Sequence, residues 1–197
     1  SASISNKTIK QANTITYNPV IYELSKENKE LIPKTIKHIF IISDRRERIE
    51  TLRKIAKAVN SDKTMIFINT KYDLEESLQK LQYHNYNVAA LAGNIDKQSK
   101  KKAVEDFQNG RLQYLLATDV AARGLQIDHV STVINVNLPE EPTEYLHRAG
   151  RCGRNNEQGL CISIITENEL NKIKKYQKAF NINIVQKRLY NGKIVSK

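Results

Sequence analysis

The chain has 197 residues, of which 40% are apolar and 27% are charged, so it is long enough for one globular domain with a sizeable core. It has no run of about 18 apolar residues and no signal-peptide pattern, and its two cysteines are too few for a disulfide framework or a paired zinc motif; we therefore expect a cytoplasmic protein with no membrane contact and no metal site. The formal net charge of +11 favours a nucleic-acid partner, although a lysine-rich surface with no partner would give the same balance.

Residues 1–31 are polar and irregular, and we interpret them as an N-terminal extension and inter-domain linker that precedes a domain over residues 32–197. In that domain, short apolar runs bounded by turn residues predict buried strands. These runs cover residues 36–43, 64–69, 87–91, 112–117, 131–136 and 159–165, followed by an expected edge strand at 182–189.

Amphipathic segments between the runs predict helices, including a lysine-rich helix over 97–108. Pro142 fits the first turn of another helix. The candidate capping pairs are Asp44 with Glu47, Thr70 with Asp73, and Thr166 with Glu169.

The alternation of strands and helices indicates an α/β fold, a three-layer sandwich with a mostly parallel central sheet and helices on both faces. Ligands of such sheets lie beyond the carboxyl ends of the strands. The polar residues that follow the strands are therefore functional candidates, namely Thr70, Gly93, Thr118 with Asp119, and the segment after Asn137.

Residues 145–154, Tyr-Leu-His-Arg-Ala-Gly-Arg-Cys-Gly-Arg, place three arginines at three-residue spacing among glycines. Guanidinium groups are permanently charged, planar donors that suit phosphate, and glycine lets a ligand come close. The stretch therefore predicts a site for a polyanion. Salt bridges to Glu140, Glu141 or Glu144 are the alternative interpretation.

Several stretches resemble the motifs of the DEAD-box ATP-dependent RNA helicases of superfamily 2, in the order and with the spacing of that family. They are residues 117–124 (Ala-Thr-Asp-Val-Ala-Ala-Arg-Gly, similar to motif V), residues 147–154 (motif VI), residues 67–70 (Phe-Ile-Asn-Thr, motif IV), and residues 91–93 with Gln98 and Lys101 (the motif between IV and V). The resemblance implies the C-terminal RecA-like domain of such a helicase.

The chain contains no G-x-x-x-x-G-K-[ST] phosphate loop and no Asp-Glu-Ala-Asp run. In the family these belong to the N-terminal RecA-like domain, which would hold most of the ATP and its Mg²⁺. The resemblance therefore implies half of an ATP hydrolase, inactive without that partner domain. We expect the fragment itself to be monomeric.

By position in the motifs, Arg151 and Arg154 correspond to finger arginines, which approach the γ-phosphate of ATP when the two domains close. The other residues implied to bind the cofactor are Gly124, Gln126, His147 and Arg148. The residues implied to contact phosphates or riboses of single-stranded RNA are Thr70, Gly93, Gln98, Lys101 and Thr118. Helix capping is the alternative role for the two threonines, and a solvated helix face is the alternative for the lysines beside Lys101.

The chain departs from the family pattern at a few positions. Gln126 stands where the family usually has an Asp that contacts the ATP ribose, which places nucleotide affinity in doubt. Lys101 replaces the usual Arg and keeps the charge without the bidentate geometry. Both finger arginines remain, so we expect an active parent enzyme.

The resemblance implies local unwinding of RNA duplexes or remodelling of RNA–protein complexes. A non-catalytic RNA-binding or RNA-chaperone module with a RecA-like fold is the alternative, and the intact pair Arg151 and Arg154 disfavours it. A DNA helicase of the same superfamily is disfavoured by the residues of motif VI.

Overall fold

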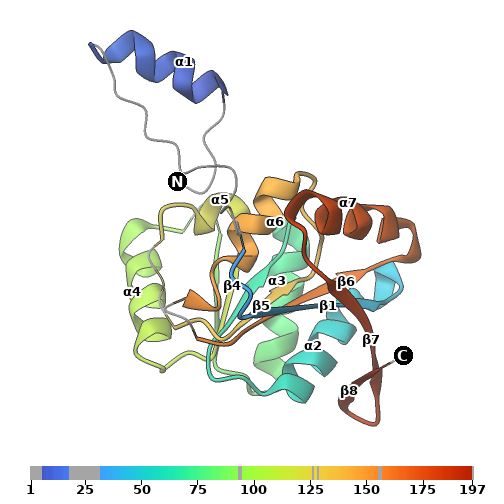
Figure 1. Ribbon diagram of the computed structural model, residues 1–197. Helices are drawn as coiled ribbons and strands as arrows, with labels where there is room; N and C mark the ends of the chain where they lie inside the picture. The colour runs from blue at the N-terminus through green and yellow to red at the C-terminus, as the bar shows by residue number, and fades with distance from the viewer. Residues whose placement is uncertain are drawn as a thin grey trace. The chain divides into compact units, whose positions relative to one another are not determined.

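The computed structural model describes residues 6–17, 32–92, 95–125, 127, 129–154 and 157–196 of a chain that divides into two compact units, Ser1–Leu31 and Ile32–Lys197 (Figure 1). In the first unit, residues Asn6–Ile15 form the helix α1, which differs from the irregular segment predicted from the sequence. Its apolar residues Ile9, Ala12 and Ile15 recur every three positions, a helical spacing that the sequence does contain.

The second unit is built on one eight-stranded sheet with the order β3-β4-β2-β5-β6-β1-β7-β8. The strands are β1 (Ile36–Ile42), β2 (Thr64–Phe67), β3 (Val88–Leu91), β4 (Tyr114–Ala117), β5 (Thr132–Asn135), β6 (Gly159–Ile165), β7 (Ile184–Tyr190) and β8 (Lys193–Ser196). Each neighbouring pair is parallel except β7 and β8, so the predicted mostly parallel sheet is confirmed.

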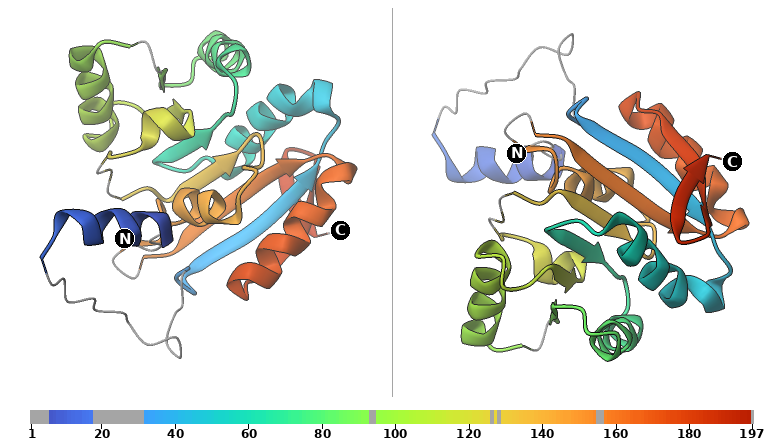
Figure 2. Two further views of the ribbon diagram at one scale, coloured as in Figure 1. Left: turned by 90° about the horizontal axis from the view of Figure 1, so that it is seen from above. Right: turned by 90° about the horizontal axis from the view of Figure 1, so that it is seen from below.

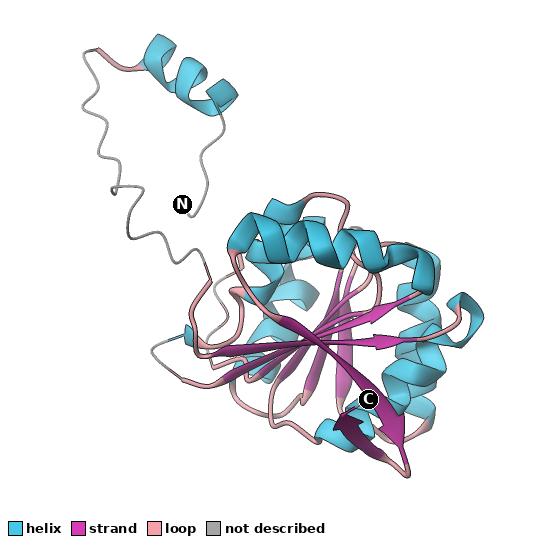
Figure 3. Ribbon diagram, turned by 45° about the vertical axis from the view of Figure 1, so that its right-hand side comes forward, coloured by secondary structure: helices cyan, strands magenta, loops and turns pink. Residues whose placement is uncertain are grey.

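Helices cover both faces of the sheet (Figure 3). They are α2 (Arg48–Val59), α3 (Lys71–Tyr83), α4 (Lys97–Gln108), the short α5 (Asp119–Ala122), α6 (Pro142–Ala149) and α7 (Leu170–Phe180), with 3-10 turns at Arg45–Glu47 and Glu167–Glu169. Helix α4 lies at the end of the sheet formed by β3 and β4, and the β7–β8 hairpin lies at the opposite end (Figure 2). No helix in the described part of the chain is long and apolar enough to cross a lipid bilayer.

The C-terminal hairpin corrects one prediction. The segment expected as an edge strand is β7, which lies between β1 and β8, and the edge is β8, a strand that was not predicted. Asn191 and Gly192 join the two strands with φ angles of 46° and 73°. Positive φ at both central residues is typical of the tight hairpin turn that an Asn-Gly pair favours, so the signal was present in the sequence.

Two of the three predicted helix caps are confirmed. Thr70 accepts a hydrogen bond from the backbone N–H of Asp73, and Thr166 and Glu169 form a reciprocal capping box. The prediction for Asp44 is wrong, because its side chain makes no capping hydrogen bond to the turn that follows. Pro142 occupies the first turn of α6, as its fixed φ angle favours.

Gly153, between the second and third arginines of motif VI, combines two constraints. Its φ angle is +67°, and a Cβ atom added there would lie 2.5 Å from Cγ1 of Ile36, at the start of β1. The glycine therefore lets the motif pack directly against the first strand of the sheet.

We expect Gly153→Ala to lower the free energy of unfolding by about 3 kcal/mol, because it adds left-handed backbone strain to a steric clash. Gly110→Ala is the matched control, since Gly110 has a φ angle of +77° but open space around the added Cβ. Gly110→Ala should lower the free energy of unfolding by about 1 kcal/mol, because it adds only the backbone strain. Urea unfolding of both variants measures the difference, and equal losses would contradict the close packing.

Candidate functional site

The carboxyl ends of β2 and β5 form the switch point of the sheet. From β2 the chain continues toward β3, whereas from β5 it continues toward β6 on the other side, so the two connections diverge. Ligands of open α/β sheets bind at such points. The backbone N–H of Asn69, after β2, donates to Oδ1 of Asn137, after β5, at 3.1 Å. The two strand ends are thus held together by asparagine side chains.

Arg148 of α6 reaches into this point and is buried, with 1% of its surface exposed. Its Nε and Nη2 atoms donate to the two carboxylate oxygens of Asp119 at 2.7 and 2.5 Å. Nη1 donates to the carbonyl of Asn137 at 2.8 Å and to Oδ1 of Asn135 at 3.3 Å, and Nη2 donates to Oδ1 of Asn69 at 2.9 Å. These five bonds use all five N–H donors of a guanidinium.

This geometry gives Arg148 a structural role, whereas its predicted part in the cofactor site stays a prediction. A bond to a nucleotide would require one of its five bonds to break, at a cost in a buried site. The guanidinium also lies 5.1 Å from the ring centroid of Phe67, at the end of β2. Arg148 therefore joins β2, β5, α5 and α6 and positions the residues around it.

The α5 turn, which carries most of motif V, begins with two residues that serve the structure. Oγ1 of Thr118 accepts a hydrogen bond from the backbone N–H of Ala121 at 3.3 Å and caps the turn. Asp119, the next residue, is the carboxylate that binds Arg148. Asp119 therefore forms an ion pair with the first arginine of motif VI.

Arg151 and Arg154 lie against the loop that follows α5. Nη1 of Arg151 donates to the carbonyl of Leu125 at 2.6 Å and Nη2 to that of Ala122 at 3.3 Å, while Nη1 of Arg154 donates to the carbonyl of Ile127 at 3.3 Å. Burial, and then the nearby charge of Arg154, lower the pKa of Arg151. Motifs V and VI, separated in the sequence, are therefore in direct contact.

Two of the three glutamates offered as salt-bridge partners for the motif VI arginines have other partners. Glu144 pairs with Arg123 at 3.2 Å, and Glu140 pairs with Lys172 at 2.7 Å. Within the described residues, Arg151 forms no ion pair with a carboxylate. Its positive charge is balanced only by the partial charges of carbonyl oxygens.

A hollow of about 240 Å³ opens beside Arg151. Gly124 lines it with a φ angle of +73°, and no atom lies within 4 Å of the position that a Cβ would take. The exposed side chain of His147 and the exposed Arg123 line it too. The structure thus brings together Gly124, His147, Arg148 and Arg151 from the predicted cofactor site, whereas Gln126 lies outside the described residues.

The predicted RNA residues lie at the ends of different strands. Thr70 follows β2 and Thr118 follows β4, and these two strands are neighbours in the sheet. Both threonine hydroxyls accept capping bonds, which leaves the hydroxyl proton of each available for donation. Capping and ligand binding are therefore compatible at both positions. Gly93 lies outside the described residues.

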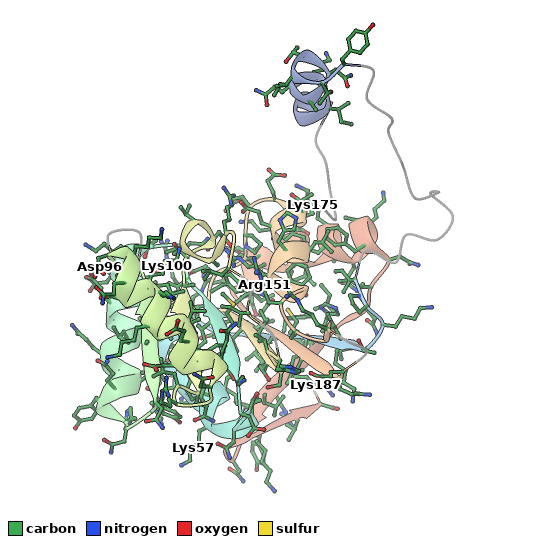
Figure 4. The ribbon with its side chains drawn as sticks, turned by 90° about the vertical axis from the view of Figure 1, so that its left-hand side faces the viewer. Lys57, Asp96, Lys100, Arg151, Lys175 and Lys187 are labelled. Carbon is green, nitrogen blue, oxygen red and sulfur yellow. The ribbon has the colours of Figure 1, made fainter. Side chains whose placement is uncertain are left out.

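Gln98 and Lys101 lie in the first turns of α4, where Asp96 caps the backbone N–H groups of Gln98 and Ser99 at 2.9 Å (Figure 4). Four lysines occupy the first half of the helix: Lys97, Lys100, Lys101 and Lys102. Positive charge at a helix N-terminus opposes the helix dipole and favours an anion there. Among the residues that the structure describes, Lys101 pairs with exposed Glu105 at 3.7 Å, which is a weak interaction.

A buried polar cluster also connects α6 to β1 and α7. Nδ1 of His38, on β1, is hydrogen-bonded to the hydroxyl of Tyr145 at 2.8 Å, and the Tyr145 ring stacks on Tyr176 of α7 at 4.7 Å between centroids. Burial lowers the pKa of His38 from 6.5 to about 4 and raises that of Tyr145. Nε2 of His38 is buried without a hydrogen-bond partner in the described part of the chain.

Reasoning from the sequence missed the three asparagines that bind Arg148. Asn69, Asn135 and Asn137 all lie at or just after the ends of β2 and β5. The signal was their position, because a polar side chain at a strand end in a parallel sheet faces the ligand edge. The prediction named Asn69 only as part of motif IV and Asn137 only as the residue before a candidate segment.

A family model and individual relatives of the chain indicate the same protein family. Residues 47–156, more than half of the chain, match the family described as the helicase conserved C-terminal domain. The chain is 31% identical over 99% of its length to the DEAD-box ATP-dependent RNA helicase CshC of Bacillus cereus, and it covers 49% of that protein. It is 32% identical over 93% of its length to the ATP-dependent RNA helicase FAL1 of Eremothecium gossypii, covering 46% of it. The chain thus spans about half the length of the relatives it matches.

Solved structures agree with these matches. The structure of Saccharomyces cerevisiae Dbp5 bound to RNA and ADP BeF3 has a TM-score of 0.83 at 27% identity, over 95% of this chain and 50% of that one. The structure of the C-terminal domain of the DEAD-box protein Dbp5 has a TM-score of 0.74 at 29% identity, over 78% of this chain and 91% of that one. The predicted RecA-like α/β fold is therefore confirmed.

We expect Arg148→Ala to lower the free energy of unfolding by about 3–5 kcal/mol, because it breaks a buried ion pair and leaves the surrounding polar groups without a partner. Arg123→Ala is the matched control, since it removes an arginine from the exposed pair with Glu144 and should cost less than about 1 kcal/mol. Chemical denaturation measures both. A small loss for Arg148→Ala would show that the buried pair does not join the strand ends.

The lowered pKa of His38 predicts a pH dependence of stability. The unfolded chain takes up a proton near pH 6.5 and the folded chain only near pH 4, so stability is full above the first value and falls as pH decreases toward the second. The total loss should be about 3 kcal/mol, at about 1.4 kcal/mol for each pH unit. The free energy of unfolding, measured at several pH values in this range, should depend less on pH in His38→Gln than in the wild type. His84→Gln, which replaces an exposed histidine, should keep the wild-type dependence.

Proposed function

Because the chain belongs to the helicase conserved C-terminal domain family and is the C-terminal RecA-like domain of a DEAD-box RNA helicase, we propose that it completes the ATP-hydrolysis site of a two-domain helicase. In this proposal an N-terminal RecA-like domain of the same protein holds most of the ATP and its Mg²⁺. The present domain supplies arginines to the γ-phosphate and part of the RNA track. The parent protein would unwind short duplexes locally or remodel RNA–protein complexes.

The observation that carries the proposal is the environment of Arg151. Its guanidinium is half-buried, lies close to the like charge of Arg154, and has only carbonyl oxygens as acceptors in the described part of the chain. A charge in this environment is poorly compensated and would gain from an incoming anion. The hollow beside it leaves room for one to approach.

The proposed chemistry is electrostatic. Negative charge spreads over the oxygens of the transferring phosphoryl group, and a finger arginine from another domain stabilises it. Arg151 and Arg154 fill that role, and both must exchange their carbonyl acceptors for phosphate oxygens when the domains close. Arg148 keeps its protein partners and fixes α6, from which both fingers emerge.

The remaining cofactor residues are proposed to shape the nucleotide cleft. Gly124 has no side chain and open space before it, so a nucleotide could contact the backbone of motif V there. His147, exposed at the same hollow, would lie at the domain interface. Gln126 is proposed to bind the ribose through its neutral amide in place of the family's usual carboxylate.

For RNA, we propose a track of phosphate contacts from β2 across β4 to α4. Thr70 and Thr118 offer hydroxyl donors at the ends of neighbouring strands, and Gln98 and Lys101 lie near the start of a helix whose first half is rich in lysine. Gly93 would complete the track. Contacts of this kind to the backbone bind single strands without reading their sequence.

We expect Arg151→Ala in the two-domain parent protein to reduce RNA-stimulated ATP hydrolysis by about a thousandfold or more, because the loss falls on the transition state. The affinity for ATP should change little. Steady-state turnover and nucleotide binding, measured on the same protein, separate the two effects.

Arg111→Ala is the control for this experiment. Arg111 is an exposed arginine that pairs with Asp106 and lies outside the hollow, so the variant should hydrolyse ATP at the wild-type rate. The 197-residue chain alone should show no turnover. Near-normal hydrolysis by Arg151→Ala would remove the finger role and favour the alternative, a non-catalytic RNA-binding module.

A further inference from the structure

A second hollow, of about 340 Å³, lies between α2 and β7 and has no part in the site described above. Its walls are the end of β1, the first two turns of α2 and the second half of β7. Its charged residues are Lys54, Lys187, Arg188 and Glu47. We call it the hairpin groove, because the β7–β8 hairpin forms one wall.

The hairpin groove carries an excess of positive charge that the protein does not neutralise. Within the described residues, neither Lys54, Lys187 nor Arg188 forms an ion pair, and Glu47 pairs with none of them. The Nζ atom of Lys187 donates to the hydroxyl of Ser196 at 2.9 Å, which holds the ammonium without balancing its charge. The two lysines, Lys54 and Lys187, outnumber the one carboxylate, and this excess of positive charge favours an anionic ligand.

One further feature of the groove suits a nucleic-acid strand. Ser43 and Thr51 line it, and their hydroxyls are hydrogen-bonded to each other at 2.8 Å. Consecutive strand residues point to opposite faces of a sheet, so the side chain of Arg188 lies on the face of β7 opposite Lys187, with its guanidinium 5.7 Å from the ring centroid of Tyr190. That ring, 60% exposed, lies outside the groove on the same strand, where it can stack on a base.

The groove also lies on the same edge of the sheet as the proposed RNA track. Strands β1 and β7 run parallel to β2, so their carboxyl ends point to the same edge. From β2 to β7 the sheet order has four steps, which correspond to about 19 Å at about 4.8 Å per step. Figure 4 shows Lys187 apart from Arg151, so the groove is separate from the finger arginines.

We propose that the hairpin groove is a second RNA site, which binds phosphates of a single strand that extends beyond Thr70 along this edge. The inference rests on the proposed RNA function and adds a site to it. Lys54 and Lys187 bind phosphate from opposite walls of the groove. Only an RNA long enough to leave the first track reaches this site.

The test compares two double variants of the 197-residue chain that lose the same charge. Lys54→Gln with Lys187→Gln alters the groove, whereas Lys174→Gln with Lys178→Gln removes two exposed lysines from α7. Each protein is titrated with labelled oligouridylates of about five and about twenty nucleotides over a range of salt concentrations. Thermal unfolding of each variant confirms that it is folded.

The groove variant should bind the long RNA about tenfold more weakly at low salt, and the slope of log affinity against log salt should fall by about 1.4, at about 0.7 per phosphate contact. Its affinity for the short RNA should equal that of the α7 variant. Because Lys187 also bonds Ser196, Lys54→Gln alone is the second variant, with an expected slope change of about half as much.

Two outcomes distinguish a failure of the groove as an RNA site from a failure of the proposed RNA track. If the wild-type chain binds neither RNA, the proposed RNA track fails. If it binds both RNAs and the groove variant matches the α7 variant for the long one, the track stands and the groove is not an RNA site.

Discussion

The position of nearly every functional element in this domain depends on one buried guanidinium. Arg148 donates five hydrogen bonds to residues from β5, α5 and the segments after β2 and β5, so the carboxyl edge of the sheet is fixed around a single side chain. A buried charge is tolerated only when its donors are satisfied, and here all of them are. The two other arginines of the motif lie three and six residues further along, and they donate hydrogen bonds to backbone carbonyls of the loop after α5.

The domain thus uses arginine in two opposite ways within one short motif. Arg148 is paired with a carboxylate and buried, whereas Arg151 lies against carbonyl oxygens beside an open hollow. The two arginines differ in the groups that lie within hydrogen-bonding distance of their guanidiniums. Glu144 and Glu140, which could have neutralised Arg151, are bound to Arg123 and Lys172 instead.

Much of this arrangement could be predicted from the sequence, because the strands of a buried parallel sheet appear as compact apolar runs and the motifs lie directly after them. The limits of α4 and β6 match the structure, and Thr70 and Thr166 cap as expected. The sequence places the asparagines at strand ends, but it does not show their contacts with Arg148, since Asn135 and Asn69 are about 13 and 79 positions away and only the strand order brings them together. Strand β8 was not predicted, although the Asn191-Gly192 pair favours a hairpin turn, because the segment that follows the turn is short and half polar.

The strand order has a consequence for how the chain is made. β1 is the first described strand of this domain to leave the ribosome, yet its two neighbours are β6 and β7, whose pairing residues begin at Gly159 and Ile184. The apolar segment Ile-Lys-His-Ile-Phe-Ile-Ile must therefore wait for more than a hundred further residues to be synthesised before it can pair. Long-range parallel pairing of this kind is slow and leaves strand edges open to aggregation. Nascent chains of this domain should accordingly depend on chaperones until β6 has emerged.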